Sequence, residues 1–524
     1  MILLVKVKVL KTMRIVRLIA FLGILAPSSL AGQHSLPADQ SNPSQAGPVA
    51  TGGSSDIPKF KSRTELVLVP VVVRDKQGQH VSGLSKDDFR LEENGKEQSI
   101  VSFEEMRAEK MDVPVARADS GYSNLPLDSS KHLRVTIVVL DLLNSRMLQR
   151  TEARDQLIKF FSKELLGEEP VSLLCITSKG VRLVLPFTSD TNLLIKALRE
   201  TKLEDTWLGT PGDSLRETLK QVRQIGQAYV GVPGRKTLLW ATGDIPYPAT
   251  AQDYDGAGMQ MRLDLEDTER SLQSANVGVY PVSVLAWSVA DPSSLPRIVR
   301  NETLRSFADQ TGGKICMESN GFRDCLNAAI GDSRSYYMLS YTLKPEDRKP
   351  GWRSLKVKLI AKQADVRARS GFYYGDREVS DKPRKPHEDE INALASPLAS
   401  SGVRMNVRVL LQRTPSPASA GGKTTAQFLL IIPLDSVTID PTRDAALDLE
   451  VGAIALDKNM KEAGEFLHPV RGNPKPEILR QFAQEGIRLQ EKLDLLPGAY
   501  DVRFVVRDNA TGQIGTVVFP FEMK

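Results

Sequence analysis

Cysteine and histidine are scarce in this sequence, which has three cysteines and five histidines in 524 residues. The histidines are dispersed along the chain, so we expect no metal cage built from cysteine and histidine ligands. Three cysteines are compatible with an exported protein that has few disulfide bonds. Cys316 and Cys325 are close enough in sequence to form a disulfide in an oxidising compartment, whereas Cys175 lies within an apolar strand pattern. Buried free thiols are an equally good interpretation of the pair.

An excess of positive charge is also missing once the first residues are set aside. The formal net charge is +5, but residues 1–31 hold five lysines and arginines and no acidic residue, so the rest of the chain is formally neutral. A neutral chain offers no basic surface to a polyanion. We therefore expect no nucleic-acid partner.

Apolar runs long enough to cross a bilayer are absent. Leu18–Ala26 is a nine-residue apolar run, well short of the ~20 residues that a spanning helix needs. It follows the basic residues and precedes Ser29-Leu30-Ala31, which fits a secretory cleavage site. We predict a signal peptide over residues 1–31 and an exported protein, extracellular, periplasmic or attached to the envelope. An uncleaved anchor is the alternative, and Met1 and Met13 are both candidate starts.

The motifs of common hydrolases are missing too. The sequence has no GxSxG elbow, no HExxH helix and no Cys/His nucleophile pair. Gly231–Thr237 superficially looks like a phosphate loop, but it leads into a strand, whereas a phosphate loop leaves a strand and opens a helix. These absences predict that the protein is not an enzyme.

Strand and helix patterns alternate in the middle of the chain. Leu133–Leu140 is a nearly continuous apolar run, typical of a fully buried strand. The alternation over residues 132–334 predicts an α/β domain with a doubly wound, mostly parallel sheet and a hairpin edge strand. The other expected strands are Val171–Thr177, Val181–Phe187, Thr237–Thr242, Val277–Leu285 and Lys314–Met317. The expected helices are Thr151–Leu166, Thr191–Glu200 capped by Ser189, Ser214–Tyr229 capped by Asp213, Leu263–Ala275 and Glu302–Gln310.

Short strand patterns flank this domain on both sides. Residues 64–106 form an antiparallel unit too small to be stable alone, and residues 335–375 supply further strands. We predict that the two segments form one β-sandwich into which the α/β domain is inserted, so residues near 70 should contact residues near 370. Residues 32–63 predict a disordered leader, 376–400 a linker, and 401–524 a C-terminal, immunoglobulin-like all-β sandwich.

The motif Asp141-Leu142-Leu143-Asn144-Ser145 follows the buried strand. With Gly209-Thr210 and Leu238–Gly243, it resembles the pattern of a von Willebrand factor A domain. The flanks, including Thr311–Lys314 and Val366–Tyr373, are similar to VWFA-related proteins typical of Acidobacteria. This resemblance covers about residues 65–375. It implies a metal-ion-dependent adhesion site at the carboxyl ends of the strands, where open α/β sheets bind ligands.

The family's metal-binding residues are only partly present. Asp141, Ser145 and Thr210 match, but Leu143 replaces the first serine and Thr242 stands where the family has an aspartate. Leu143 has no side-chain oxygen to offer Mg²⁺. These substitutions favour a metal-free surface over a degenerate Mg²⁺ or Mn²⁺ site. In the second case the loops shift and Asn144 or Asp244 substitutes as a ligand.

Trp207 and Tyr247 are expected on the same rim, where aromatic side chains are favoured anchors for a protein partner. Packing within the loops explains them equally well. The resemblance implies an exported, non-enzymatic adhesion or protein-binding module whose partner the sequence does not name. A metal-free envelope scaffold is the alternative, and an exported hydrolase is a distant third.

Overall fold

The structure is a computed structural model that describes residues 65–107, 121–124, 135–163, 170–243, 256–283, 297–316, 322–344, 347–360, 364–375, 387–412 and 422–523. The expected signal peptide and leader lie outside these residues. Within them, no helix is both long and apolar enough to span a membrane.

A five-stranded sheet forms the centre of the α/β domain, in the order β10-β9-β6-β7-β8. The central strand β6 pairs in parallel with β7 and β9, and β10 pairs in parallel with β9. Strand β8 is the antiparallel hairpin edge that the sequence predicts. The bounds are Val135–Asp141 for β6, Val171–Thr177 for β7, Gly180–Thr188 for β8, Lys236–Thr242 for β9 and Val277–Ser283 for β10.

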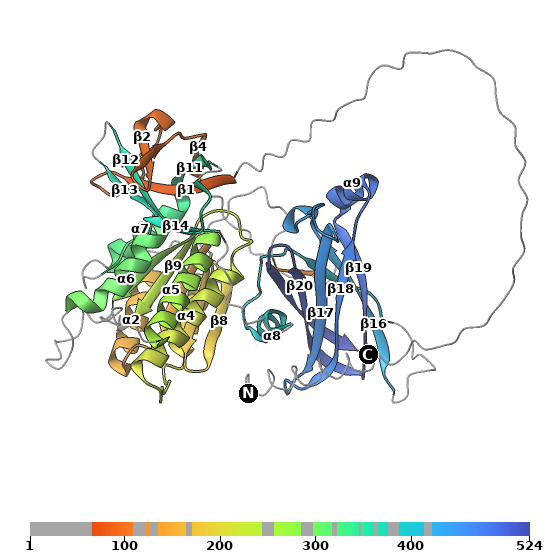
Figure 1. Cartoon of the computed structure of the whole chain (residues 1–524). Coiled ribbons are helices and arrows are strands. Elements are labelled where there is room, and N and C mark those ends of the chain that lie inside the picture. Colours follow the sequence, from red (N-terminus) through yellow and green to blue (C-terminus); the bar gives the residue numbers. More distant parts are fainter. Residues whose placement is uncertain are drawn as a thin grey trace, which may run out of the picture.

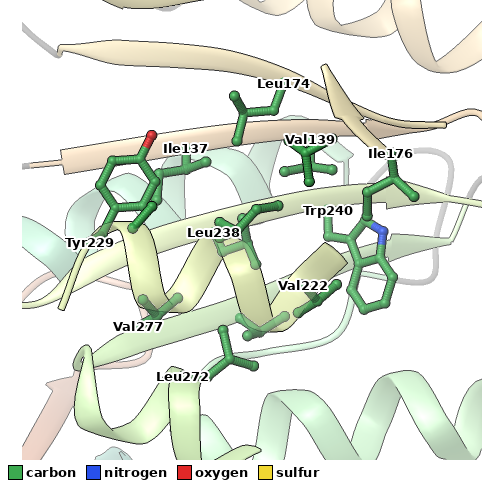
Figure 2. Packing of buried hydrophobic residues seen from close by; sticks show 14 of the residues in the cluster. Ile137, Val139, Leu174, Ile176, Val222, Tyr229, Leu238, Trp240, Leu272 and Val277 are labelled. Atoms are coloured by element: carbon green, nitrogen blue, oxygen red, sulfur yellow. The ribbon is translucent and has the colours of Figure 1, made fainter. Parts of the chain in front are cut away.

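Helices cover both faces of this sheet (Figure 1). Alternate residues of β6 enter opposite cores: Ile137 and Val139 pack in one cluster, and Val138 and Leu140 pack in the other. Figure 2 shows the first cluster, where Trp240 and Leu238 of β9 meet Val222 of α4. The helices of the domain are α2 (Met147–Lys163), α3 (Thr191–Glu200), α4 (Pro211–Ala228), α5 (Gly256–Ser274), α6 (Arg297–Thr311) and α7 (Phe322–Arg334).

Several expected boundaries in this domain are wrong. Helix α4 begins at Pro211 and is capped by Thr210, while Asp213, the expected cap, is the third helical residue and closes the capping box. Helix α3 is capped by Asp190 instead of Ser189. Among the described residues of the expected strand Lys314–Met317, only Cys316 pairs, through an isolated parallel bridge to Val282. The sequence analysis did not predict α7.

The two segments that flank the α/β domain form one small sandwich. Its sheets have the orders β13-β1-β11-β4 and β14-β12-β2-β3, and side chains of both sheets share one core. Val71 pairs with Ala368, so the expected contact between residues near 70 and near 370 is present. The bounds are Glu65–Arg74 for β1, Phe89–Glu93 for β2, Lys96–Gln98 for β3, Ser102–Arg107 for β4, Ser335–Leu343 for β11, Gly351–Leu359 for β12, Asp365–Ala368 for β13 and Gly371–Tyr374 for β14.

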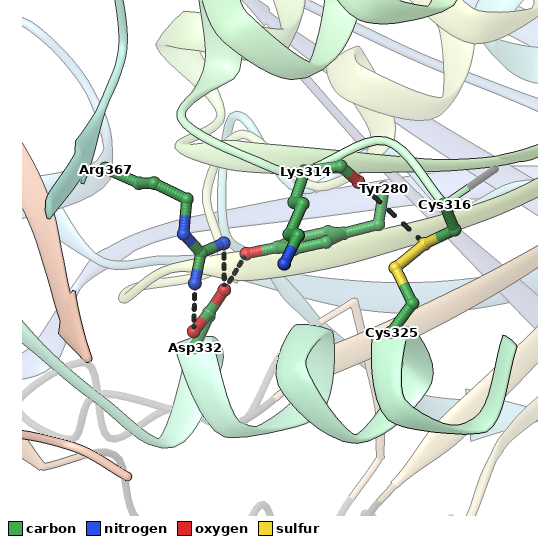
Figure 3. Close-up of a disulfide and its surroundings, with 6 residues drawn as sticks. All are labelled: Tyr280, Lys314, Cys316, Cys325, Asp332 and Arg367. Carbon is green, nitrogen blue, oxygen red and sulfur yellow. Dashed lines mark hydrogen bonds and ion pairs between the residues drawn. A yellow bond between two sulfur atoms is a disulfide. The ribbon is translucent and has the colours of Figure 1, made fainter. Parts of the chain in front are cut away.

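A buried carboxylate joins the sandwich to the α/β domain. Asp332 of α7 is completely buried and accepts hydrogen bonds from Arg74 Nε at 3.0 Å and from Tyr280 Oη at 2.6 Å. Arg367 donates to both of its oxygens, at 2.7 and 3.1 Å. Figure 3 shows Asp332 with Arg367 and Tyr280, near the disulfide between Cys316 and Cys325. Strands β1 and β13 of the sandwich and elements β10 and α7 of the α/β domain all contribute. These ion pairs and hydrogen bonds therefore attach the inserted domain to the sandwich on both sides of the insertion.

A second contact between these two units contains a buried glutamate. Glu269 of α5 is 1% exposed and lies next to Tyr373 of β14 and Gln310 of α6, and its Oε1 has no hydrogen-bond partner. Burial, reinforced by the nearby charge of Glu266, raises the pKa of Glu269 from its ordinary value of 4.5 to about 8. The folded protein therefore holds this proton more tightly than the unfolded chain.

We expect Glu269 to make stability fall as pH rises. Its contribution is fully present below pH 4.5, where the unfolded group is protonated, and is lost as pH rises to about 8. The slope from this one group is up to about 1.4 kcal/mol per pH unit. Urea unfolding across this range should show a shallower decline for Glu269→Gln than for the wild type. Glu200→Gln, at the exposed end of α3, is the control, and equal slopes for Glu269→Gln and the wild type would contradict the prediction.

The C-terminal domain consists of two four-stranded antiparallel sheets, in the orders β19-β16-β15-β5 and β18-β17-β20-β21. Strand β5 comes from the segment before the α/β domain, which the sequence analysis did not predict. The two sheets share one core, and the immunoglobulin-like topology stays a prediction. The bounds are Tyr122–Ser123 for β5, Asn406–Gln412 for β15, Thr424–Ile432 for β16, Leu447–Asp457 for β17, Glu462–Gly472 for β18, Ile487–Leu495 for β19, Gly498–Asp508 for β20 and Ile514–Met523 for β21.

The expected linker 376–400 is structured over its described part. Residues Glu388–Ala395 form helix α8, which packs on the C-terminal sandwich through Ile391 and Leu394. After α8, Leu398 enters the core of the α/β domain, and the Ser401 hydroxyl donates to the Ala228 carbonyl at 2.6 Å. This segment therefore contacts both domains. A further unpredicted helix, α9, spans Pro476–Glu485.

Candidate functional site

Asp141 is the last residue of β6 and lies at the carboxyl end of the sheet, beside the point where the strand order reverses between β6 and β9. Its side chain is 1% exposed and accepts five hydrogen bonds. Oδ1 accepts from the backbone N–H groups of Leu143 at 3.0 Å and Asn144 at 2.9 Å. Oδ2 accepts from Asn144 Nδ2 at 2.8 Å, Thr242 Oγ1 at 2.8 Å and Trp240 Nε1 at 3.3 Å.

These contacts set the charge state of the carboxyl group in opposite directions. Burial raises the pKa of Asp141, and the hydrogen bonds from Asn144, Thr242 and Trp240 lower it and offset part of that rise. A buried carboxylate must find donors within the protein, and here the loop after β6 and the neighbouring strand β9 supply them. Asp141 therefore organises the loop 142–146 around itself.

Asn144 carries this organisation to α4. Its side-chain nitrogen donates to Asp141 Oδ2 and also to Thr218 Oγ1, the latter at 2.7 Å. Thr218 in turn donates to the Ser214 carbonyl within the helix. The amide nitrogen of Asn144 thus occupies the side of Asp141 that faces α4, as a hydrogen-bond donor.

Arg150 is a residue of this site that the sequence analysis missed. From α2 its guanidinium donates to the carbonyl of Ser145 at 2.7 Å and to that of Leu142, both in the loop after β6. It also donates to the carbonyls of Leu203 at 2.7 Å and Asp205 at 3.1 Å. Burial lowers the pKa of Arg150, and the charges of Asp205 and Asp141 oppose that effect. A single cation therefore holds two rim loops together.

The side chains of the other predicted metal ligands form no hydrogen bond with Asp141 or Asn144 among the described residues, or lie outside those residues. The Thr210 hydroxyl donates to Asp213 Oδ2 at 2.7 Å and caps α4. Ser145 is buried, and its carbonyl accepts from Arg150. Asp244, and Tyr247 of the predicted partner rim, fall outside the described residues. Trp207 is half-buried, and its indole N–H donates to the Thr210 carbonyl at 3.2 Å.

This set of donors does not fit a Mg²⁺ ion, which requires near-octahedral coordination by oxygen. Both oxygens of Asp141 already accept protein hydrogen bonds, and the Thr242 hydroxyl, at the position of the family's aspartate, is one of their donors. Asn144 presents its side-chain nitrogen to the carboxylate, and Leu143 has no side-chain oxygen. Each oxygen of Asp141 therefore has at least two donors among the described residues.

No protein-family model matches the sequence, and no curated protein matches it. Among solved structures, the chain is similar to an aerotolerance-related membrane protein from Bacteroides fragilis, with 17% identity, a TM-score of 0.25, and coverage of 38% of this chain and 98% of that one. It is also similar to BatB from Bacteroides thetaiotaomicron, with 11% identity, a TM-score of 0.24, and coverage of 38% of this chain and 98% of that one. A third similar structure is the SpRpn10 VWA domain, with 12% identity, a TM-score of 0.23, and coverage of 38% of this chain and 97% of that one. TM-scores this low assign neither a family nor a function to the chain. The strand order defines its α/β fold.

Exposed apolar side chains flank the loops that Arg150 joins. Met147 and Leu148, in the first turn of α2 directly after the Asp141 loop, are 50% and 72% exposed. Leu208, between the carbonyls bound by Arg150 and the start of α4, is 93% exposed. We call Met147, Leu148 and Leu208 the apolar rim. The sequence places Leu208 on this rim beside Trp207, but it did not indicate Met147 and Leu148.

Proposed function

We propose that this chain is an exported, non-enzymatic protein-binding module of the von Willebrand factor A type, related to the VWFA-related proteins of Acidobacteria that its sequence resembles. It binds a protein partner through the apolar rim at the carboxyl end of the sheet. The observation that carries the proposal is the exposure of Leu148, in the first turn of α2, and of Leu208, on the loop before α4, next to loops that Arg150 holds by hydrogen bonds. The strand order, with a central buried strand ending in Asp141, supports the A-type assignment.

The hydrogen bonds beneath the rim favour binding by a prearranged surface. Asp141 fixes the loop after β6, and Arg150 joins this loop to residues 203–205. Loops that are already ordered lose little conformational entropy when a partner docks. The rim therefore presents its apolar side chains in one arrangement.

In this proposal the site works without a metal ion. In a metal-dependent adhesion site, the ion's open position accepts a carboxylate from the partner. Here Asp141 is occupied by five protein donors, and burial of apolar side chains supplies the binding free energy instead. Binding should therefore resist chelators and be sensitive to charges placed on the rim.

We expect a double substitution Leu148→Glu/Leu208→Glu to abolish capture of the partner from the native envelope or secreted fraction. Two carboxylates at the centre of an apolar contact must be desolvated without a partner charge, which lowers affinity by at least about a hundredfold. Quantitative affinity capture with mass spectrometry measures this loss, and EDTA should leave capture by the wild type unchanged.

Val101→Glu/Ile360→Glu is the matched control, because these side chains are 61% and 68% exposed on the first sandwich. It should retain the partner. If the control variant loses the partner and the rim variant keeps it, the binding surface is the first sandwich, as the envelope-scaffold alternative requires. Loss of capture in EDTA would contradict the metal-free mechanism.

A further inference from the structure

A histidine and two glutamates meet where α8 packs on the C-terminal sandwich. His387 caps the N-terminus of α8, Glu390 lies in its first turn, and Glu450 lies on β17. One ligand atom from each of these residues lies within 4.8 Å of the other two. Among the described residues, this is the one such group of three or more histidine, cysteine and acidic side chains. Glu390 and Glu450 are 60 positions apart in the sequence, so only the fold brings them together.

Two buried polar atoms in this group have no hydrogen-bond partner. Glu390 is completely buried; its Oε1 accepts from Arg507 at 3.0 Å, whereas its Oε2 accepts from no group. The His387 Nδ1 lies 2.9 Å from Glu450 Oε1 but lacks the geometry of a hydrogen bond. Leaving such atoms unsatisfied costs about 1–3 kcal/mol each. A cation bound between them would satisfy both.

The charges around the group also favour a cation. Arg507 of β20 is opposite Glu450 in the sheet and forms ion pairs with Glu390 and, at 3.5 Å, with Asp389. One arginine therefore faces three carboxylates, and the imidazole of His387 completes the surroundings. Arg507 occupies one oxygen of Glu390 and leaves the other available.

We propose that His387, Glu390 and Glu450 form a binding site for a divalent transition-metal ion, with Zn²⁺ as the best fit. One imidazole nitrogen and two carboxylate oxygens are ligands that Zn²⁺ accepts, and a water completes its four-coordinate shell. The imidazole distinguishes the site from an all-oxygen Mg²⁺ or Ca²⁺ site. This site is separate from Asp141, and the proposal does not depend on the function proposed above.

A metal ion at this position stabilises the junction between two domains. Glu450 belongs to the C-terminal sandwich, and His387 and Glu390 belong to α8 (Figure 1). The chain leaves α8 towards Ser401, whose backbone and hydroxyl groups bind Ala228 and Gly231 of the α/β domain. Binding of the ion therefore fixes the helix from which this connecting segment starts.

Zinc titration of the purified full chain tests this proposal. We expect one Zn²⁺ per chain, an affinity at least about tenfold lower in Glu390→Gln, and a melting temperature that Zn²⁺ raises in the wild type and not in the variant. His387→Asn is the second variant, because asparagine tolerates the left-handed backbone of this residue (φ 63°) and removes the imidazole.

The matched control is Glu491→Gln. Glu491 pairs with His468 at 3.0 Å in the same domain, and among the described residues no third ligand joins that pair. This variant should bind Zn²⁺ like the wild type. The proposal would be overturned if Glu390→Gln and His387→Asn both kept the wild-type zinc affinity and the wild-type rise in melting temperature with Zn²⁺. It would also be overturned if the wild type showed no saturable binding at millimolar Zn²⁺. In either case the group is only an ion pair that attaches α8.

Discussion

Asp332→Ala is expected to lower the free energy of unfolding by about 3–5 kcal/mol, because it leaves charged partners buried without a counter-charge. Arg74 and Arg367 both lose their ion pair with Asp332, and the Tyr280 hydroxyl loses its acceptor. Two guanidinium groups then lie in a contact from which water is largely excluded. Urea unfolding, followed by tryptophan fluorescence, measures the change.

The control for this prediction is Asp365→Ala, which removes another carboxylate partner of Arg367. The Asp365 side chain is 53% exposed and lies 3.1 Å from Arg367 Nε. An exposed ion pair of this kind contributes less than about 1 kcal/mol. If Asp332→Ala costs no more than Asp365→Ala, the buried network does not hold the α/β domain to the first sandwich.

Asp141→Ala is also expected to lower the free energy of unfolding by about 3–5 kcal/mol, but for a different reason. Each buried donor left without an acceptor costs about 1–3 kcal/mol, and the costs of neighbouring donors add only in part. The substitution leaves Trp240 Nε1, Thr242 Oγ1 and the Leu143 N–H without the acceptor they share. The same unfolding measurement applies. Thr242→Val, which removes one donor and keeps the carboxylate, should cost only about 1 kcal/mol.

A metal-binding role for Asp141 predicts the opposite pattern. A carboxylate that serves mainly as an ion ligand can be removed with little effect on folding in the absence of the ion, because its charge is then uncompensated. Wild-type protein that takes up Mg²⁺ saturably, together with a stable Asp141→Ala variant that does not, would therefore contradict the structural role. We expect instead no saturable heat with millimolar Mg²⁺ and a destabilised variant.

The sequence predicted the α/β domain well because its signals are local. The apolar run before Asp141 and the apolar faces of α3 and α4 each follow from residues that are neighbours in the chain. Even the insertion of this domain could be inferred, since two strand sets too small to stand alone flank it. Boundaries were less certain: Thr210 and Asp213 are both good caps, and the proline at 211 decided between them.

The candidate sites could be predicted only in part, because they depend on distant residues. The sequence identified Asp141 and Thr242 as the positions that matter, but not that one would donate to the other across two strands. Arg150 is one of many arginines until the fold places four carbonyls around it. His387 belonged to an expected linker, and nothing near it in the chain indicates Glu450 as a neighbour.

By itself the sequence determined the parts of this protein: a doubly wound α/β domain inserted between strand segments, a further β-rich domain, and a polar motif, Asp141 to Ser145, at the end of the central strand. Tertiary structure decided how these parts act. It used the oxygens of Asp141 for hydrogen bonds from the following loop and from β9, buried Asp332 between two arginines, and brought His387 to two glutamates. The physical reason is that apolar periodicity specifies which face of an element is buried, whereas hydrogen bonds and charges are matched only after those faces have packed.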